Sequence, residues 1–125
     1  MLRRTTVALA TAAALAVALP AAAQAAPPEA VAAKNCSLSG KTRSLGPTYT
    51  TSLKVKRVSC RKGESVVKGY YKCRVRNGGK KGRCGGVQRF KCSERRYNSI
   101  RTQFDARVTC KKGRKVVKHT YTQFT

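Results

Sequence analysis

The stretch Ser59 to Arg76, SCRKGESVVKGYYKCRVR, decides the fold. Its apolar residues recur at the spacing of one helix face, and they are Val66, Val67, Tyr70 and Tyr71. The basic residues gather on the opposite face, and they are Arg61, Lys68, Lys72 and Arg76. Ser59 is a good N-cap, and Asn77-Gly78-Gly79 predicts a left-handed stop. The pattern therefore predicts one amphipathic helix from Cys60 to Arg76.

Residues on both sides of this helix show strand patterns. Tyr49 to Lys56 alternates, with Tyr49, Thr51, Leu53 and Val55 on one face and Thr50, Ser52, Lys54 and Lys56 on the other. A period of two with one apolar face indicates a half-buried strand. After the helix, Val87 to Cys92 predicts a short strand with Phe90 and Cys92 on one face. The polar segment Ser93 to Gln103 has no clear period.

The C-terminal part predicts a β-hairpin. Asp105 to Cys110 alternates small or apolar residues with polar ones, Ala106, Val108 and Cys110 against Arg107 and Thr109. Lys111-Lys112-Gly113-Arg114 then forms a turn into Lys115 to Phe124. Together with the helix, these strands predict an α+β fold: a small disulfide-bonded domain with one amphipathic helix packed on a short antiparallel sheet.

An internal similarity leaves an alternative open. Arg57 to Gly63 matches Arg107 to Gly113, fifty positions later, and Val66 to Lys68 matches Val116 to Lys118. A true duplication predicts an all-β domain of two hairpins, in which the first copy is a strand pair. The helical spacing of the first copy favours the α+β fold.

Part of the chain, from Val58 to Phe124, resembles a group of small secreted proteins of actinobacteria. The resemblance rests on Val58-Ser59-Cys60 before a Val-Val-x-x-Tyr-Tyr helix, on Phe90-Lys91-Cys92, and on the Val108 to Gly113 hairpin turn. It implies export and a cationic, cysteine-containing fold. No activity is known for such proteins, so the resemblance transfers no functional residue.

The N-terminal residues predict export. A basic start at Arg3-Arg4, an apolar run from Val7 to Leu19 and a small-residue end near Ala26 are typical of a secretory signal peptide, residues 1–26. The apolar run is too short to span a bilayer, so we expect no transmembrane anchor after cleavage. Residues 27–35 read as a flexible leader and residues 36–125 as a single disulfide-bonded cationic domain. The predicted location is extracellular.

All six cysteines lie in the predicted exported part, at Cys36, Cys60, Cys73, Cys84, Cys92 and Cys110. An even number in a small secreted domain predicts three disulfides, because such a domain has a thin core. The spacing includes no Cys-x-x-Cys pair and the chain has one histidine, so we expect no metal site. Sequence alone does not choose among the 15 pairings that six cysteines allow.

Charge is the strongest functional signal. The chain has 28 Lys and Arg against 4 Asp and Glu, and removal of residues 1–26 takes away only Arg3 and Arg4, which leaves a net charge near +22. Such a surface attracts polyanions. The basic residues that we predict to bind form two clusters: Lys72, Arg74, Arg76, Lys80, Lys81 and Arg83 at the helix end, and Lys111, Lys112, Arg114, Lys115 and Lys118 at the hairpin turn, with Arg95, Arg96 and Arg101 adding to them.

Aromatic residues beside a basic groove would supply stacking for nucleic acid, and the candidates are Tyr70, Tyr71, Phe90, Tyr97 and Tyr121. The single histidine, His119, shares a predicted strand face with Val117 and Tyr121, which favours a structural role. A small ribonuclease with Glu94 as base and His119 as acid is chemically conceivable, and only Glu94 or Asp105 is placed to meet His119. No catalytic or cofactor-binding motif supports an enzyme, and we expect no cofactor.

These patterns exclude a cytosolic metabolic enzyme, a collagen-like chain and a coiled coil. They predict an exported, non-enzymatic protein that binds anionic polymers or cell-envelope components, with nucleic acid as a non-specific partner. The alternatives are an antimicrobial or membrane-active protein and the basic ribonuclease. The membrane alternative needs a helix whose apolar face is free to insert. The oligomeric state is not determined by the sequence.

Overall fold

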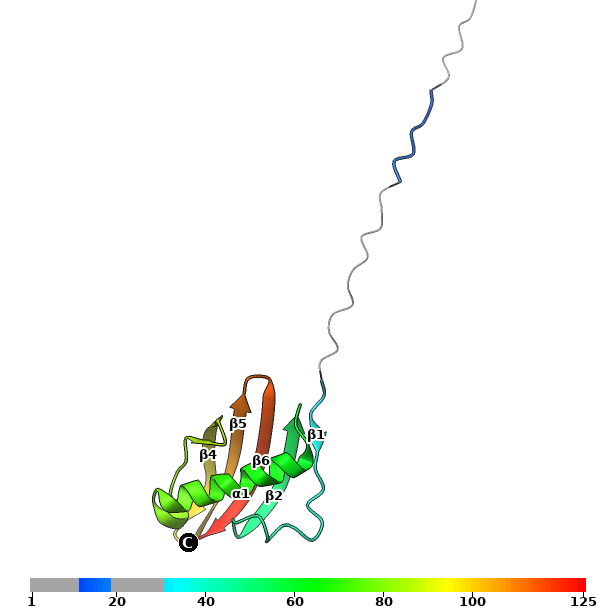
Figure 1. Ribbon diagram of the computed structural model, residues 1–125. Helices are drawn as coiled ribbons and strands as arrows, with labels where there is room; N and C mark the ends of the chain where they lie inside the picture. The colour runs from blue at the N-terminus through cyan, green and yellow to red at the C-terminus, as the bar shows by residue number, and fades with distance from the viewer. Residues whose placement is uncertain (1–11, 19–30) are drawn as a thin grey trace, which may run out of the picture.

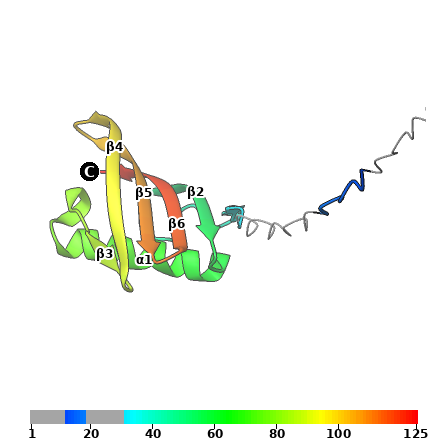
Figure 2. The same cartoon turned by 90° about the horizontal axis from the view of Figure 1, so that it is seen from above.

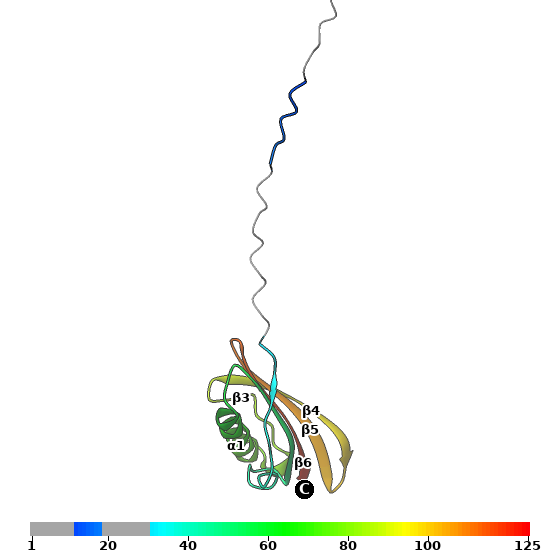
Figure 3. The ribbon, with the colours of Figure 1, turned by 90° about the vertical axis from the view of Figure 1, so that its right-hand side faces the viewer.

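The computed structural model describes residues 12–18 and 31–125, and most of the predicted signal peptide therefore lies outside the described residues. In the described part, one long helix packs on one face of a six-stranded antiparallel sheet, and three disulfides cross-link the chain (Figure 1). The predicted α+β fold is thus confirmed. The side view in Figure 3 shows two layers, α1 on one side and the sheet on the other.

Strands and helix follow one another in a simple order. β1 (Lys34–Asn35) and β2 (Tyr49–Lys56) precede α1 (Cys60–Arg76) and a short 3₁₀ turn, η1 (Gly79–Lys81). β3 (Gly86–Val87), β4 (Phe90–Ile100), β5 (Gln103–Lys112) and β6 (Lys115–Phe124) follow. The spatial order is β1-β2-β6-β5-β4-β3, so the last strand inserts beside the first long one (Figure 2). β1 lies within the stretch predicted as a flexible leader.

The helix has the predicted bounds. The Ser59 side chain accepts a hydrogen bond from the backbone N–H of Lys62 at 3.1 Å, as an N-cap does. The predicted left-handed stop is not found at the cap, because the C-cap Asn77 keeps a right-handed conformation, and the first left-handed residue after the helix is Gly79, where η1 begins. Near the N-terminus, Gly63 lets the helix approach β2, because a Cβ there would lie 2.6 Å from Val55 Cγ1.

The core lies between α1 and the sheet. Val66, Val67 and Tyr70 face the sheet and are at most 1% exposed. They pack with the inward residues of the strands, which include Leu53, Val55, Ala106, Val108 and Val117. The apolar helix face is therefore used by the core, and it is not free to insert into a bilayer. In the described residues no helix combines the length and apolarity that a membrane crossing requires.

The structure corrects three strand predictions. Val87–Cys92 is not one strand, because a tight turn at Gln88 and Arg89 separates β3 from β4. Both turn residues have positive φ, as a two-residue hairpin needs, although neither is glycine, asparagine or aspartate. The segment Ser93–Gln103, whose sequence has no clear period, is mostly β4. In β2 an irregularity between Thr50 and Ser52 buries Thr50 and exposes Thr51, the reverse of the prediction.

The C-terminal hairpin is as predicted, with β5 and β6 in unbroken register from Gln103 opposite Phe124 to Lys112 opposite Lys115. Gly113 occupies the turn with φ +58°, a conformation that glycine adopts without strain. The similarity at an offset of fifty residues has no structural counterpart, because Ser59 caps a helix and its match Thr109 lies inside β5. The all-β alternative is therefore wrong.

The disulfides join Cys36 to Cys60, Cys73 to Cys84 and Cys92 to Cys110. The first ties the start of the helix to the residue after β1, and the second ties its last turn to the segment before β3. The third joins directly opposite residues of β4 and β5. Three disulfides are typical of an extracellular or otherwise oxidising compartment.

Candidate anion-binding surface

The sheet has one face that α1 does not cover. Because side chains alternate along a strand, the residues between the core positions of β2, β4, β5 and β6 all point to this open face. Seven of them are basic, and we call them the open-face cations: Lys54, Lys56, Lys91, Arg95, Arg107, Lys111 and Lys118. All are exposed except Lys56, which is half-buried.

The register brings like charges directly opposite each other. Lys91 faces Lys111 and Arg95 faces Arg107 across β4 and β5, and Lys54 faces Lys118 across β2 and β6. Paired strands lie about 4.8 Å apart. Like charges in directly opposite positions destabilise a sheet by a few tenths of a kcal/mol. Three such pairs on one face therefore lower the stability of the sheet, and the fold does not require them.

Carboxylates do little to neutralise this face. Glu94 points to the core side of β4 and Glu64 lies on α1, where it pairs with Lys41 at 2.8 Å. Asp105 is the one acid of the open face among the described residues. Its carboxylate accepts hydrogen bonds from Thr122 Oγ1 at 2.6 Å and Asn98 Nδ2 at 3.0 Å, which lower the pKa of Asp105. The middle of the face is therefore strongly positive.

Hollows on the open face are lined by the same cations. One lies between β4, β5 and the hairpin turn, one at the Lys54 end of β2, and one around Ser52, Arg107 and Thr120. Lys118 lines all three. No phenylalanine or tyrosine lines any of the three. The face therefore offers contiguous positive charge, with hydroxyl groups between the charged side chains.

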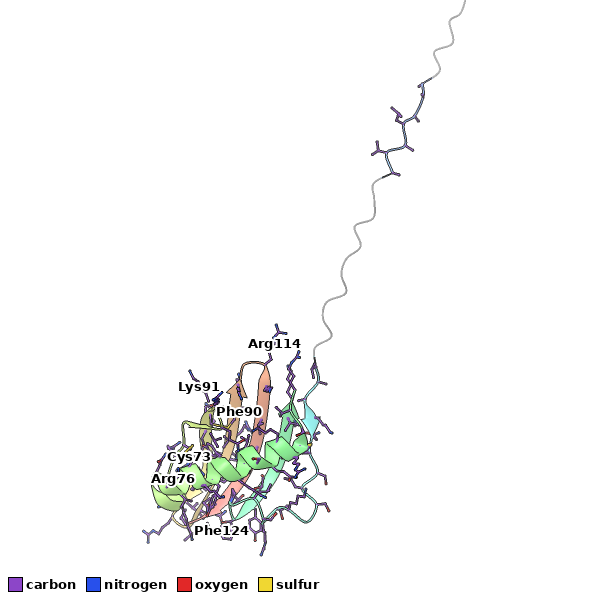
Figure 4. All side chains as sticks on the ribbon, viewed as in Figure 1. Cys73, Arg76, Phe90, Lys91, Arg114 and Phe124 are labelled. Carbon is purple, nitrogen blue, oxygen red and sulfur yellow. A yellow bond between two sulfur atoms is a disulfide. The ribbon has the colours of Figure 1, made fainter. Side chains whose placement is uncertain are left out.

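The two clusters predicted from sequence lie at separate ends of the molecule, as the labels of Arg76 and Arg114 show (Figure 4). Lys111 belongs to the open face, and Lys112, Arg114 and Lys115 are exposed around the hairpin turn. Lys72, Arg76, Lys80, Lys81 and Arg83 are exposed at the helix end. Lys91 follows the buried Phe90 in β4 and, because side chains alternate along a strand, it lies on the open face; both residues are labelled in Figure 4.

Arg74 does not belong to a binding surface, which corrects the prediction. It is fully buried under the end of the helix. Its guanidinium donates to the carbonyl of Lys80 at 2.9 Å and to Oε1 of Gln123 at 3.1 Å, and it lies 4.5 Å from the centre of the Tyr121 ring. Arg74 thus clamps α1 to η1 and β6, a structural role.

Glu94 lies at the centre of a second buried group of polar residues. Its carboxylate accepts hydrogen bonds from Arg96 Nε at 2.7 Å, from Tyr121 Oη, and from Arg83 at 3.4 Å. Arg96 also donates to the carbonyls of Lys81 and Gly82. Burial, followed by the hydrogen bond to Glu94, raises the pKa of Tyr121 far above its ordinary value. This network holds the loop after the helix against β4.

His119 faces the core, as its alternation with Val117 and Tyr121 indicates. It is 1% exposed, and neither ring nitrogen has a hydrogen-bond partner in the described residues. Burial, with a smaller contribution from Arg74, lowers the pKa of His119 to about 3. Asp105 lies on the opposite face of the sheet and does not meet His119. The residues of the ribonuclease hypothesis are thus buried or separated in this structure.

Among the aromatic residues considered for stacking, Tyr70, Phe90 and Tyr121 are at most 2% exposed. Tyr97 is 38% exposed and lies beside Arg107, whose guanidinium is 5.9 Å from the centre of its ring. It occupies the end of the open face, opposite Asp105. Stacking partners are therefore absent from the middle of the charged face and present only at one end.

Fold and surface together define a small, disulfide-bonded α+β protein with a cationic sheet face. No protein-family model matches the chain, and no curated protein and no solved structure is significantly similar to it.

Proposed function

We propose that this protein binds anionic polymers, without chemical conversion, through the open-face cations. One observation carries the proposal: three pairs of like charges stand directly opposite each other on a face that no other part of the described chain covers. An anionic chain laid over the face relieves this repulsion and releases the counterions that the free protein holds. The seven cations on one face also allow several contacts at once.

The proposal includes a location outside the cytoplasm. The features of residues 1–26 are those of an export signal, and three disulfides suit an oxidising compartment. The relevant polymers are then those of the cell envelope and the extracellular space. Nucleic acid is bound through its backbone and without sequence preference, because the cations meet phosphates rather than base edges.

The test measures binding to a fluorescent duplex DNA as a general polyanion at several salt concentrations. We expect affinity to fall steeply with salt, with a log-log slope of about −0.9 per phosphate neutralised. The variant Arg95→Gln/Arg107→Gln should bind at least tenfold more weakly at low salt, with a slope about two units shallower.

The matched control is Arg61→Gln/Lys68→Gln, which removes the same charge from the exposed face of α1. We expect it to lose less than threefold in affinity, because the charges that it removes lie on the other side of the molecule, beyond a screening length of about 8 Å. Equal losses in the two variants would show that net charge alone drives binding. Failure of the wild-type protein to bind at low salt would refute the proposal.

A further inference from the structure

A hollow between β4 and β5 combines hydroxyl groups with the open-face cations. Ser93 and Thr109 stand directly opposite each other at its floor. Lys91 and Lys111 form the next pair on the same face of these strands, two residues away, and Lys118 lies opposite Thr109 on β6. Alternate residues of a strand are about 6.8 Å apart and neighbouring strands about 4.8 Å. Three ammonium groups on flexible stems thus surround two hydroxyls.

These hydroxyls differ from the others on the same face. Thr120 Oγ1 lies 2.6 Å from both Thr51 Oγ1 and Ser52 Oγ, and Thr122 donates to Asp105. Their hydrogen-bonding capacity is used within the protein. Ser93 and Thr109 make no side-chain hydrogen bond to any described residue, although they lie where the positive charge is densest.

A disulfide fixes the floor of the hollow. Cys92 and Cys110 precede Ser93 and follow Thr109 in their strands, and they are bonded directly across the sheet with Cα atoms 4.1 Å apart. Neither strand can slide or separate at this point, so the backbone positions of Ser93 and Thr109 keep their register without a ligand. A preformed site loses less conformational freedom on binding.

The chemistry of the hollow matches a phosphate group. A phosphate has several acceptor oxygens, lysine ammonium groups bind it as point charges, and hydroxyls donate to the oxygens that remain. No aromatic side chain lines the hollow. The nearest open-face aromatic on β4, Tyr97, is four residues from Ser93, about 13.6 Å along the strand. A base attached to the bound phosphate therefore has nothing to stack on.

From these observations we infer that the Ser93–Thr109 hollow is a seat for one phosphate of a polyol-phosphate chain, a polymer of phosphodiesters joined by short polyols without bases. The inference rests on the proposed function, and it adds a phosphate-specific site to a face that otherwise binds by charge. Charge alone makes no distinction between polymers of equal charge density. Two hydroxyl donors at a set position among three lysines favour a chain whose anionic groups place an acceptor oxygen within reach of both hydroxyls, as a regular phosphodiester chain does.

The experiment compares three probes of equal length or charge by competition fluorescence anisotropy. They are an abasic phosphodiester 12-mer, an oligothymidylate 12-mer, and a heparin fragment of matched charge. The variant Ser93→Ala/Thr109→Val removes both hydroxyls and no charge. We expect it to bind the abasic 12-mer at least fivefold more weakly, to bind heparin within twofold of the wild type, and to keep the wild-type salt slope.

Two controls separate this loss from damage to the sheet. Ser93→Thr/Thr109→Ser keeps both hydroxyls and should bind all three probes like the wild type. Thr120→Val removes a hydroxyl of the same face that is already hydrogen-bonded within the protein, and it should leave the preference for the abasic 12-mer unchanged. A loss of affinity for the abasic 12-mer that all three variants share would contradict the proposed phosphate site.

Other outcomes would also contradict the phosphate site and leave the proposed binding of anionic polymers intact. One is an unchanged affinity of the hydroxyl-free variant for the abasic 12-mer. Another is a parallel loss of heparin binding. A tenfold preference of the wild type for oligothymidylate over the abasic 12-mer would overturn the assignment to a base-free chain. If the wild type bound none of the probes at low salt, the proposed function itself would fail.

Discussion

At the scale of single residues, Arg74 shows that a basic residue in a cationic protein is not always a surface residue. Its position was available from the sequence, because residues 66, 70 and 74 follow one another at intervals of four along the buried face of the helix. Its residue type, however, predicted an exposed side chain, since a guanidinium is seldom fully buried. The partners that make burial possible, Gln123 and the carbonyl of Lys80, come from elements that no local pattern brings together.

We predict that Arg74→Ala lowers the free energy of unfolding by about 3 kcal/mol, because it leaves a cavity and removes the hydrogen-bond donor of the buried Gln123 Oε1. Denaturant unfolding measures this loss. The neighbouring exposed residue provides the control, and Arg76→Ala should change stability by less than about 0.5 kcal/mol. Folded Arg74→Ala should bind polyanions like the wild type, and a stable variant that binds poorly would return Arg74 to the binding surface.

His119 provides a prediction about acid stability. Its pKa is about 3 in the folded protein and 6.5 as a free side chain, so between these values the unfolded chain binds a proton that the folded chain does not. Stability therefore falls as pH drops below 6.5. The contribution of this residue between pH 7 and pH 4 is about 3 kcal/mol.

His119→Leu should remove that contribution and should be at least as stable as the wild type at pH 7, because both ring nitrogens are buried without partners. Urea unfolding of both proteins at pH 7, 5.5 and 4 tests this. Parallel pH profiles of the wild type and the variant would mean that His119 takes up its proton over the same pH range in the folded and the unfolded protein, which would contradict the lowered pKa.

At the scale of elements, β4 shows why a strand can lack the alternating apolar pattern from which strands are predicted. Its core-side positions begin with Phe90 and Cys92 and continue with Glu94 and Arg96, so the apolar alternation stops halfway. The strand persists because these two charges pair with each other and Arg96 also binds loop carbonyls. An alternating apolar pattern reveals a strand only where apolar side chains are buried. It does not reveal a strand whose buried positions hold a salt bridge. The helix and β6, with unbroken apolar faces, were predicted with the right bounds, and β5 extends two residues beyond the predicted Asp105–Cys110 at each end.

The opposed cations of β4 and β5 predict a gain in stability when one is removed. Arg95→Gln should raise the melting temperature by about 2 °C at low salt, since it relieves repulsion of a few tenths of a kcal/mol from Arg107. The gain should shrink at high salt, where the repulsion is screened. Calorimetry at two salt concentrations tests this. A lower melting temperature at low salt would mean that Arg95 stabilises the sheet and that its charge has a structural purpose.

At the scale of the whole molecule, the charged face depends on strand order. The alternation of β2 and β5 placed Lys54, Lys56 and Arg107 on the side opposite the apolar residues, so parts of the face could be predicted. Their assembly into one surface requires β6 to insert between β2 and β5, a pairing over more than sixty residues of chain. Clusters defined along the sequence therefore placed the binding residues at the helix end and the hairpin turn, whereas the strand register also brings seven cations together across the sheet.

Covering one face of a sheet with a helix leaves the other face available, and here the described residues of that face include seven cations and one acid. Disulfides at both ends of the helix and across β4 and β5 hold the layers together against the repulsion of so many charges. The molecule is thus built as a rigid support for a positive surface.

The most direct test of this account is an amide chemical-shift titration of the folded protein with the abasic phosphodiester 12-mer at low salt. We expect the largest shifts in β4, β5 and β6, around residues 91–95, 107–111 and 118, and small shifts in α1 and residues 77–83. Shifts concentrated at the helix end, or spread evenly over all basic residues, would contradict it.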